Sequence, residues 1–313
     1  HYVPGDSPRM QRFALSLSTE YTRLCDAVIA PSESIRDLLR QRGSNDAVEV
    51  SPSGVDTRRF SRGDGAALRR ELGIAKEAFT VGHVGRLARE KNLPFLADAV
   101  AKLLTGQPDT HFLIVGEGGA RTAMHETAAQ AGVADRFHFT GKLNDQSLID
   151  AYHAMDVFAF ASHSETQGMV LVEAMAAGLP VVAVDAPGVR EVVRHGRNGF
   201  LLAHDQADAL ADTLAGLSEP SQRQALRAEA LATALEFDEA RSAARCLEVY
   251  RQAIAAGGPV SHADNDAWER VRGRIEAEWH LLRHRGRVLR SLLQDEPVFS
   301  EMSKPDASET SQK

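Results

Sequence analysis

Short apolar runs alternate with longer amphipathic stretches between residues 79 and 202. The runs are almost continuously apolar, as in strands buried on both faces, and the stretches between them repeat their apolar residues at helical spacing. We therefore predict an α/β fold in which helices cover both faces of a doubly wound parallel sheet. The predicted strands are Phe79–Val84, His111–Val115, Arg136–Thr140, Val157–Ala161, Val181–Val184 and Phe200–Leu202. The predicted helices are Leu93–Leu104, Arg121–Ala131, Gln146–Met155, Val170–Ala177 and Pro187–Val193.

The chain before residue 61 carries a shorter alternation. Apolar residues at steps of three and four predict a helix from Met10 to Leu24, and the apolar run 27–30 predicts a buried strand. Ser32 is a good N-cap for a helix that Gly43 ends, and a strand follows at 48–50. These few elements are too little for a stable domain of their own, so we expect a partial α/β domain.

The last third of the chain is predicted to be helical and then disordered. From Asp205 to about Ala256 the pattern is helical throughout. Apolar residues between Trp268 and Leu293 recur at helical spacing among seven arginines, and the final residues 303–313 are polar. A basic amphipathic helix of this kind fits an anionic membrane surface, and a helix packed on protein with its arginines in solvent is the alternative.

Composition and charge exclude several classes of protein. Lys and Arg number 36 against 43 Asp and Glu, a net charge of -7, so the chain lacks the basic excess of a nucleic-acid-binding protein. Cys25 and Cys246 lie far apart and form no metal or redox motif, which suits a reducing compartment. No apolar run reaches the ~18 residues of a spanning helix, and no secretory signal is present. We expect a cytoplasmic protein, with peripheral membrane contact through 268–293 as an alternative.

Candidate ligand-binding residues lie in loops after the predicted strands, where parallel sheets bind their ligands. After the first strand, Arg86 and Lys91 follow a glycine-rich turn, and two cations so placed suit a diphosphate. The segment Gly116–Arg121 begins like a dinucleotide-binding turn but has Arg121 at the position of the last glycine, so it is a weak nicotinamide signal.

A third loop holds two glutamates on either side of a predicted helix start. Glu165 lies in the loop after a buried strand, Gly168 lies at the helix start, and Glu173 lies one to two turns into the helix. The amides near Gly168 form a helix N-terminus, which favours anions. A carboxylate on each side of these amides suits a ligand that carries both phosphates and hydroxyls.

Several stretches of the chain, in order, resemble the motifs of the family 4 retaining glycosyltransferases. The most specific stretch is Glu165–Pro180, followed by Pro187–Val193 and Asn198–Gly199. The likeness extends from about residue 25 to residue 250. It implies two Rossmann-like domains with the active site between them, a nucleotide sugar as donor substrate, and neither a metal nor another cofactor. The other matching stretches are Ser53–Asp56, Gly85–Arg86 with Lys91, and Val115–Gly118.

The resemblance implies a role for each matching residue. Arg86 and Lys91 would bind the donor's diphosphate and stabilise the charge that develops as it leaves, which makes them catalytic together with Glu165. Glu165 would face the donor sugar, and Glu173 would bind the ribose. The full set of residues implied to contact the donor is Arg86, Lys91, Leu143 beside the base, Glu165, Thr166, Gln167, Gly168, Met169, Val170 and Glu173.

The acceptor is less well defined by the resemblance. Thr166–Gln167 and the opening residues 1–4 are similar to the branch that glycosylates diacylglycerol, so we consider a membrane lipid and a glycan as alternative acceptors. The first half of the acceptor-side domain is not in this sequence, and the chain starts with His1 rather than Met. The resembling enzymes have a histidine in a His-Thr stretch of that domain, and neither His1 nor His83 matches it. We expect the chain to bind a nucleotide sugar and to transfer the sugar poorly on its own.

These observations predict four parts and leave two other functions open. We expect a remnant of the acceptor-side domain at 1–60, the nucleotide-sugar-binding domain at 61–236, a C-terminal helix packing back towards the first part at 237–256, and the basic helix and disordered tail at 257–313. The preferred function is transfer of a hexose from a UDP-sugar. The alternatives are a non-catalytic nucleotide-sugar-binding module and a nicotinamide-dependent oxidoreductase.

Overall fold

The computed structural model describes residues 25–44, 47–203 and 206–257, together with Thr19, Tyr21, Thr22, Arg272 and Ile275. The chain divides into two compact units, residues 1–255 and 256–313. The basic helix between 268 and 293, the tail 303–313 and most of the helix predicted at 10–24 lie outside the described residues and stay predictions. In the part of the chain that is described, no helix is long and apolar enough to cross a membrane.

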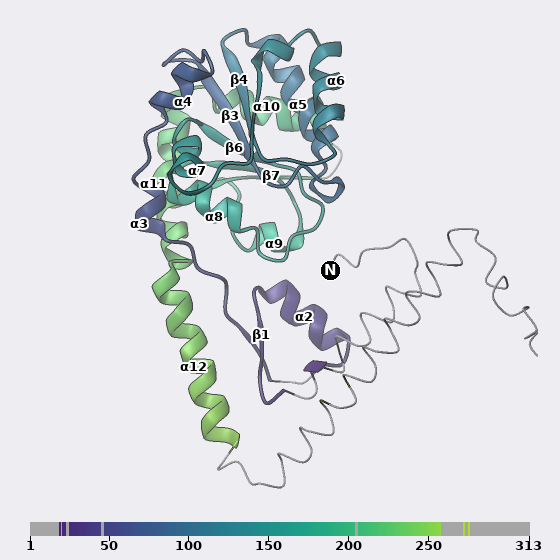
Figure 1. Cartoon of the computed structure of the whole chain (residues 1–313), viewed down its shortest axis with the longest axis vertical. Helices are drawn as coiled ribbons and strands as arrows, with labels where there is room; N and C mark the ends of the chain where they lie inside the picture. Colours follow the sequence, from purple (N-terminus) through teal and green to yellow (C-terminus); the bar gives the residue numbers. More distant parts are fainter. Residues whose placement is uncertain are drawn as a thin grey trace, which may run out of the picture. The chain divides into compact units, whose positions relative to one another are not determined.

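A six-stranded parallel sheet forms the centre of the first unit (Figure 1). Its order is β5-β4-β3-β6-β7-β8, so the chain first extends the sheet in one direction from β3 and then in the other from β6. All six predicted strands are present, each within one residue of its predicted ends. The strands are β3 (Phe79–Val84), β4 (Thr110–Val115), β5 (Phe137–Gly141), β6 (Val157–Phe160), β7 (Val181–Val184) and β8 (Gly199–Leu202).

Helices cover both faces of this sheet, as the alternating pattern predicts. On one face α5 (Leu93–Gly106), α6 (Arg121–Gln130) and α10 (Ala207–Gly216) pack with the strands into one hydrophobic core. On the other face α7 (Asp145–His153), α8 (Met169–Ala176) and α11 (Pro220–Glu236) form a second core (Figure 1). Every residue of β3, β6 and β7 is buried, because the neighbouring strands and both helical layers leave these strands no exposed face.

The predicted helix at 205–256 is interrupted twice. Gly216 ends α10, and Pro220 begins α11 at a position where proline is well tolerated. The second break separates α11 from α12 (Glu239–Gly257), because the backbone of Val55 forms an isolated bridge with Asp238. The N–H of Val55 donates to Phe237 at 2.9 Å, and the N–H of Glu239 donates to Val55 at 3.1 Å. A contact so distant in sequence leaves no trace in hydrophobic periodicity.

Two short helices were not predicted, and one prediction was too long. The polar stretch from Ser61 to Arg70 contains most of α4 (Ala66–Glu71), and α3 (Thr57–Phe60) precedes it. Arg69 holds α4 in place by donating to the carbonyl of Ala78, just before β3, at 2.9 Å and to that of Ala154, at the end of α7, at 2.8 Å. The helix predicted at Pro187–Val193 is α9, which ends at Arg190.

The segment before residue 51 forms the predicted small α/β unit. β1 (Val28–Ala30) and β2 (Val48–Val50) pair in parallel, and α2 (Glu33–Gln41) connects them. Ser32 is the predicted N-cap, since its hydroxyl accepts from the N–H of Ile35 at 3.3 Å. Gly43 follows the helix with a φ of 78°, a conformation that glycine adopts without a steric penalty.

Candidate functional site

The candidate site lies where the strand order reverses, between β3 and β6. In a doubly wound sheet the loops at such a point leave in opposite directions and open a crevice at the carboxyl ends of the strands. The loop after β3 carries Arg86 and Lys91, and the loop after β6 carries Glu165. The topology therefore brings the predicted cations and the predicted carboxylate to one edge of the sheet.

Lys91 and Glu165 meet directly at this edge. The ammonium of Lys91 donates to Oε1 of Glu165, and the two side chains are 18% and 12% exposed. The same ammonium lies 5.7 Å from the centre of the Phe160 ring, whose face attracts a cation. The pair is therefore largely shielded from solvent. Its electrostatic attraction is stronger than that of a pair exposed at the surface.

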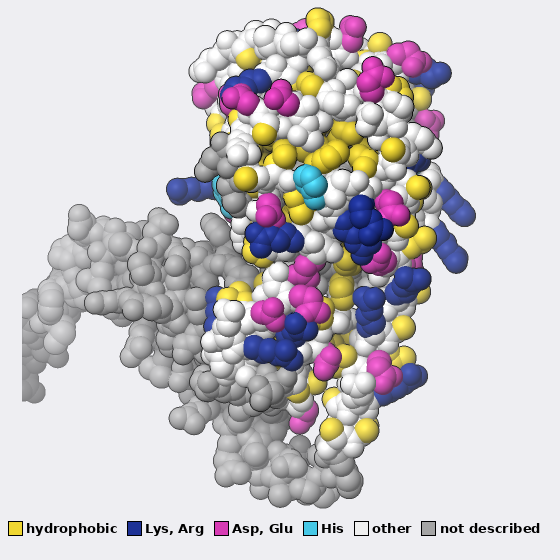
Figure 2. Space-filling view, turned by 180° about the vertical axis from the view of Figure 1, so that it is seen from behind, with side chains coloured by type: hydrophobic (Ala, Val, Ile, Leu, Met, Phe, Trp, Pro, Cys, Tyr) yellow, Lys and Arg dark blue, Asp and Glu magenta, His cyan; other side chains and the backbone are white. Residues whose placement is uncertain are grey.

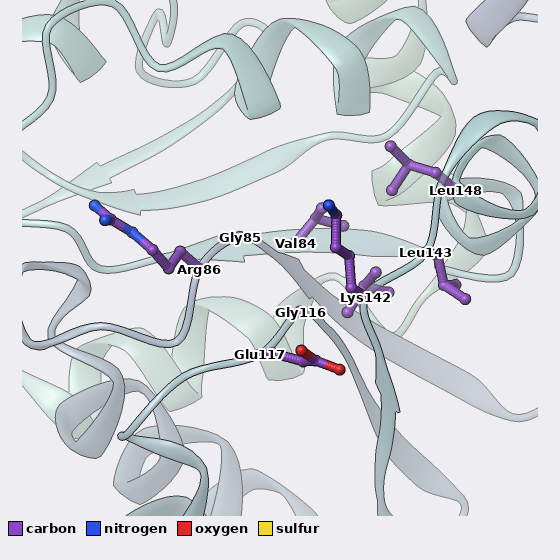
Figure 3. Close-up of a pocket in the computed structure, with 9 residues that line it drawn as sticks. Val84, Gly85, Arg86, Gly116, Glu117, Lys142, Leu143 and Leu148 are labelled. Carbon is purple, nitrogen blue, oxygen red and sulfur yellow. The ribbon is translucent and has the colours of Figure 1, made fainter.

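Arg86 belongs to the same loop but is held differently. Its guanidinium donates to Oε1 of Glu90 at 2.6 Å, and its side chain is 67% exposed. In Figure 3 Arg86 extends away from Lys142. The carbonyl of Glu90 in turn accepts from the hydroxyl of Ser162 at 3.1 Å, which ties the loop after β3 to the loop after β6. The guanidinium of Arg86 is therefore mostly open to solvent, with one of its nitrogens held by Glu90.

The loops after β3, β4 and β5 continue the hydrogen bonding of the sheet beyond the strands. The N–H of Gly85 donates to Val115 at 3.0 Å, and the N–H of Gly116 donates to Gly141 at 2.8 Å. Gly116 has a φ of +139°, and a Cβ there would lie 1.8 Å from the carbonyl oxygen of Gly85. Gly118 meets the carbonyl of Leu87 in the same way, at 2.3 Å. Close contact between neighbouring loops thus explains these glycines without a dinucleotide.

A cavity of about 340 Å³ lies beside these loops (Figure 3). Apolar side chains form much of its wall, and the charged side chains are those of Arg86, Glu117 and Lys142. Figure 3 shows Glu117 and Lys142 on the loops after β4 and β5. Leu143, which the resemblance implies to lie beside the base, is one of the lining residues. The apolar lining residues are Val84, Val115, Leu143 and Leu148, with Gly85 and Gly116 completing the wall.

The predicted helix start after Glu165 is confirmed. Gly168 is the N-cap of α8 with a φ of 70°, so the amides of Met169 and Val170 belong to the first turn. The amides of a first turn have no partners within the helix and carry the positive end of its dipole. Gly188 packs against this loop so closely that a Cβ there would lie 2.6 Å from the carbonyl oxygen of Glu165. The loop after β7 therefore supports the loop after β6.

Glu173 lies within α8 in a mostly buried position. Its Oε2 accepts from the hydroxyl of Tyr152 on α7 at 2.7 Å. Burial raises the pKa of the Glu173 carboxyl, and the Tyr152 hydrogen bond opposes that rise. Burial is also the main cause that raises the pKa of Tyr152 well above its usual value, followed by the charge of Glu173. Tyr152 therefore stays a hydrogen-bond donor across the physiological pH range.

Thr166 and Gln167 differ in their surroundings. Thr166 is exposed, whereas Gln167 is buried and its side-chain amide is used within the protein. Its Oε1 accepts from the N–H of Ser53 at 2.8 Å, and its Nε2 donates to the carbonyl of Ser53 at 2.9 Å. The side chain of Gln167 thus links the loop after β6 to the segment before residue 60.

A second link between these segments runs through Glu191. Its carboxylate accepts the backbone N–H groups of Glu33 and Ser34 at 2.8 and 2.9 Å. These are the first amides of α2, so Glu191 satisfies the N-terminus of a helix from a distant part of the chain.

Within the described residues, no group of three His, Cys, Asp or Glu side chains is placed to hold a metal ion. On the face of the molecule in Figure 2, basic and acidic side chains are interspersed. Several of the surface charges are paired, such as Arg194 with Glu236 and Arg197 with Glu229. A mixed surface of this kind differs from the single-sign patch that binds a nucleic-acid backbone.

Comparison with known proteins identifies the family. Residues 64–232 match the family model described as "Glycosyl transferases group 1", and residues 1–59 match the one described as "Glycosyltransferase Family 4". The chain belongs to the group 1 glycosyltransferases. The chain is 35% identical over 235 residues to a D-inositol 3-phosphate glycosyltransferase of Nocardia farcinica, covering 71% of this chain and 51% of that protein. A protein of the same name from Actinosynnema mirum is 37% identical over 216 residues, covering 66% and 52%. The chain therefore spans about half the length of the curated relatives it matches.

Solved structures resemble this chain over most of its length. The structure of Anabaena Alr3699/HepE in complex with UDP and glucose superposes with a TM-score of 0.70 at 30% identity, covering 79% of this chain and 68% of that one. Sucrose-phosphate synthase from Thermosynechococcus elongatus superposes with a TM-score of 0.69 at 26% identity, covering 81% and 65%. The comparisons and the parallel sheet together confirm the predicted α/β fold.

Two buried side chains have contacts that the sequence does not reveal. In the sequence, Tyr152 resembles one more apolar position of a helix. Its hydrogen bond to Glu173 becomes visible only in the structure. His83 is fully buried, and burial is the main reason that its pKa is lowered to about 4. Its Nδ1 contacts the carbonyl of Ala159 at 3.1 Å, while its Nε2 has no partner among the described residues. A neutral ring with Nδ1 as donor fits this environment.

Proposed function

We propose that this glycosyltransferase transfers a hexose from a UDP-sugar to an acceptor hydroxyl and retains the anomeric configuration. The observation that carries the proposal is the shielded ion pair of Lys91 and Glu165 at the switch point of the sheet. A cation and a carboxylate in contact, beside the N-terminus of α8, suit a ligand in which a diphosphate is joined to a polyhydroxylated ring. Family membership and the UDP-bound HepE neighbour support the same choice of ligand.

The donor would bind along the carboxyl edge of the sheet. The base would lie in the cavity against Leu143, and Glu173 would accept from the ribose hydroxyls. The diphosphate would lie against the first amides of α8, at Gly168, Met169 and Val170. It would compete with Glu165 for the ammonium of Lys91. When the diphosphate takes the place of Glu165, a negative charge of the protein is replaced by a negative charge of the ligand. The ammonium of Lys91 therefore stays paired throughout.

The same groups would act during transfer. The bond between the anomeric carbon and the diphosphate oxygen breaks, and its electron pair leaves with the diphosphate. Lys91, and Arg86 after it leaves Glu90, would stabilise the charge that grows on this leaving group. The acceptor oxygen forms the new bond to the anomeric carbon on the face that the diphosphate leaves, and its proton passes to the departing diphosphate oxygen. Glu165, once Lys91 turns to the diphosphate, would hold the sugar hydroxyls and favour positive charge on the ring. We propose that no metal takes part.

For the acceptor we propose a phosphorylated polyol such as D-inositol 3-phosphate, because both curated relatives described above carry that name. The resemblance to the diacylglycerol branch rests on Thr166–Gln167 and residues 1–4. The side chain of Gln167 is hydrogen-bonded to Ser53 and supports the loop rather than an acceptor. A lipid acceptor, with membrane contact through residues 268–293, stays a second possibility that the same assay tests.

Calorimetric titration with UDP, GDP and NAD tests donor recognition first. We expect UDP to bind, and Lys91→Met to weaken UDP binding at least tenfold, as loss of a charge-assisted contact does. Lys76→Met is the matched control, because Lys76 is 94% exposed. Binding of NAD in place of UDP, or equal effects of the two substitutions, would refute the proposal.

Product analysis tests transfer. The chain is incubated with UDP-glucose and with D-inositol 3-phosphate or diacylglycerol vesicles, and the anomeric configuration of any product is read by NMR. Because the chain alone is expected to transfer poorly, we expect a small amount of retained product, detected over a long incubation. This product should be lost in Glu165→Gln and kept in the control Glu77→Gln, whose side chain is 90% exposed. UDP binding with no product from either acceptor would instead favour a nucleotide-sugar-binding module, and an inverted product would contradict retention.

A further inference from the structure

We propose that Tyr152 is a positioning residue that orients Glu173 towards the ribose of the donor. The inference rests on the proposed function, because it needs Glu173 to bind the ribose. It adds a residue from a different helix, α7, which the sequence motifs around Glu165 and Glu173 do not contain.

The ring of Tyr152 is fixed on both sides. It is fully buried and packs edge-on against Phe60, with ring centres 5.7 Å apart, and in a tilted arrangement against Phe158 at 5.8 Å. A buried aromatic ring held by two neighbours has little rotational freedom. Its hydroxyl therefore has one fixed direction, and in that direction lies Oε2 of Glu173 at 2.7 Å.

The hydrogen bond occupies one oxygen of the carboxylate and leaves the other. Oε1 of Glu173 forms no hydrogen bond with any residue that the structure describes. A carboxylate with one oxygen held can present the second in a defined direction to hydroxyl donors such as those of a ribose. The cavity is close by, because Leu148, one of its lining residues, precedes Tyr152 by one turn on α7.

Tyr152 also favours the charged form of the carboxylate. Burial raises the pKa of Glu173. The hydroxyl of Tyr152 opposes this rise by donating a hydrogen bond to the ionised carboxylate. An ionised carboxylate accepts stronger hydrogen bonds than a neutral acid. Removal of the hydroxyl is therefore expected to weaken the ribose contact through looser orientation of the carboxylate, and it also raises the pKa of Glu173 further.

Binding of UDP and of 2′,3′-dideoxy-UDP separates a ribose effect from a general loss of structure. We expect the wild type to prefer UDP by tenfold or more, and Tyr152→Phe to reduce that preference by roughly tenfold, the size of one charge-assisted hydrogen bond. Tyr250→Phe, on exposed Tyr250 of α12, is the matched control and should leave the preference unchanged. If Tyr152→Phe weakens both ligands equally, or neither, Tyr152 does not position Glu173.

The outcomes also distinguish this inference from the proposed function. If the wild type shows no preference for UDP over the dideoxy ligand, or if Glu173→Gln keeps the preference, the ribose role of Glu173 itself is wrong. A measurement on the unsubstituted protein guards against a variant that does not fold. The ¹³C resonance of the Glu173 carboxyl, assigned by its absence in Glu173→Gln, and the hydroxyl proton of Tyr152 should both shift when UDP binds. A Tyr152 hydroxyl signal unmoved by saturating UDP would overturn the inference.

Discussion

Replacement of Gly116 by alanine tests whether the loops at the candidate site are held by backbone contacts. Gly116 combines two demands that glycine alone meets, a φ of +139° and a Cβ position 1.8 Å from the carbonyl oxygen of Gly85. Two other glycines are controls, one with the positive φ alone and one with neither demand. Gly132 has a φ of +70° with nothing within 4 Å of its Cβ position, and Gly119 has open space and no positive φ.

The expected cost can be built up from these differences. A left-handed backbone conformation costs an alanine roughly 1 to 2 kcal/mol. A carbon needs about 3.3 Å from a carbonyl oxygen, so the loops at Gly116 and Gly85 must also part by about 1.5 Å. This movement would break the bonds from Gly85 to Val115 and from Gly116 to Gly141, each worth about 1 kcal/mol. We expect Gly116→Ala to cost about 3 to 4 kcal/mol, Gly132→Ala about 1 to 2, and Gly119→Ala within about 0.5.

Urea unfolding followed by circular dichroism gives the three free energies, and calorimetry gives UDP affinity below the unfolding transition. We expect Gly116→Ala to bind UDP more weakly, because the loops that it displaces also form the wall of the cavity. Gly132→Ala should bind normally. Equal costs for Gly116→Ala and Gly132→Ala would show that the close loop contact is not a constraint. Normal UDP binding by a destabilised but folded Gly116→Ala would show that this loop is not part of the nucleotide site.

Three further predictions concern buried and linking side chains. Because the native pKa of His83 is about 4 and the unfolded value is 6.5, the free energy of unfolding should fall by up to about 3 kcal/mol as pH drops between these values. His83→Phe should remove this loss of stability, whereas the control His125→Phe, at an exposed histidine, should keep it. Chemical unfolding from pH 7 to pH 4 measures the free energy of both variants. Identical pH curves for the two would contradict the lowered pKa of His83. The raised pKa of Glu173 acts in the opposite direction, since its contribution to stability is present below pH 4.5 and lost as pH rises through the native value. Glu173→Gln should therefore have a higher Tm than the wild type at pH 7.5 but not at pH 4, and a lower Tm at pH 7.5 would refute this. Glu191→Gln should speed amide hydrogen exchange at Glu33 and Ser34 and cost about 1 kcal/mol, as loss of a helix cap does; unchanged exchange at both amides would count against the link.

The regular part of the fold follows from local pattern, and its exceptions arise from contacts distant in sequence. The strands between 79 and 202 were predictable because burial on both faces requires continuous apolar residues, a property of each segment by itself. The break between α11 and α12 depends on the backbone of Val55, and α4 depends on the carbonyls that Arg69 contacts. Neither partner is visible from the local sequence. Periodicity therefore finds the layers and misses the places where remote segments meet.

The candidate site shows the same division. Strand order at the switch point brings together the loops of Lys91 and Glu165, so their proximity was predictable once the sheet was. The contacts that each side chain makes with its neighbours were not predictable. The contact of Arg86 with Glu90, the Gln167–Ser53 amide pair and the hydrogen bond from Tyr152 all depend on the direction of a side chain, which sequence spacing does not specify.

Gln167 and Glu191 have a consequence for how ligands would influence each other. Both belong to the loops that hold the proposed donor site, and both hydrogen-bond to backbone before residue 54. If sugar binding at Glu165 changes the free energy of these bonds, it changes the stability of the segment before residue 54 by the same amount. Thermodynamic linkage then requires the reverse, so a molecule that binds to and orders the segment around α2 must alter donor affinity by an equal factor. Two hydrogen-bonded side chains, rather than a hinge, would set the size of that coupling.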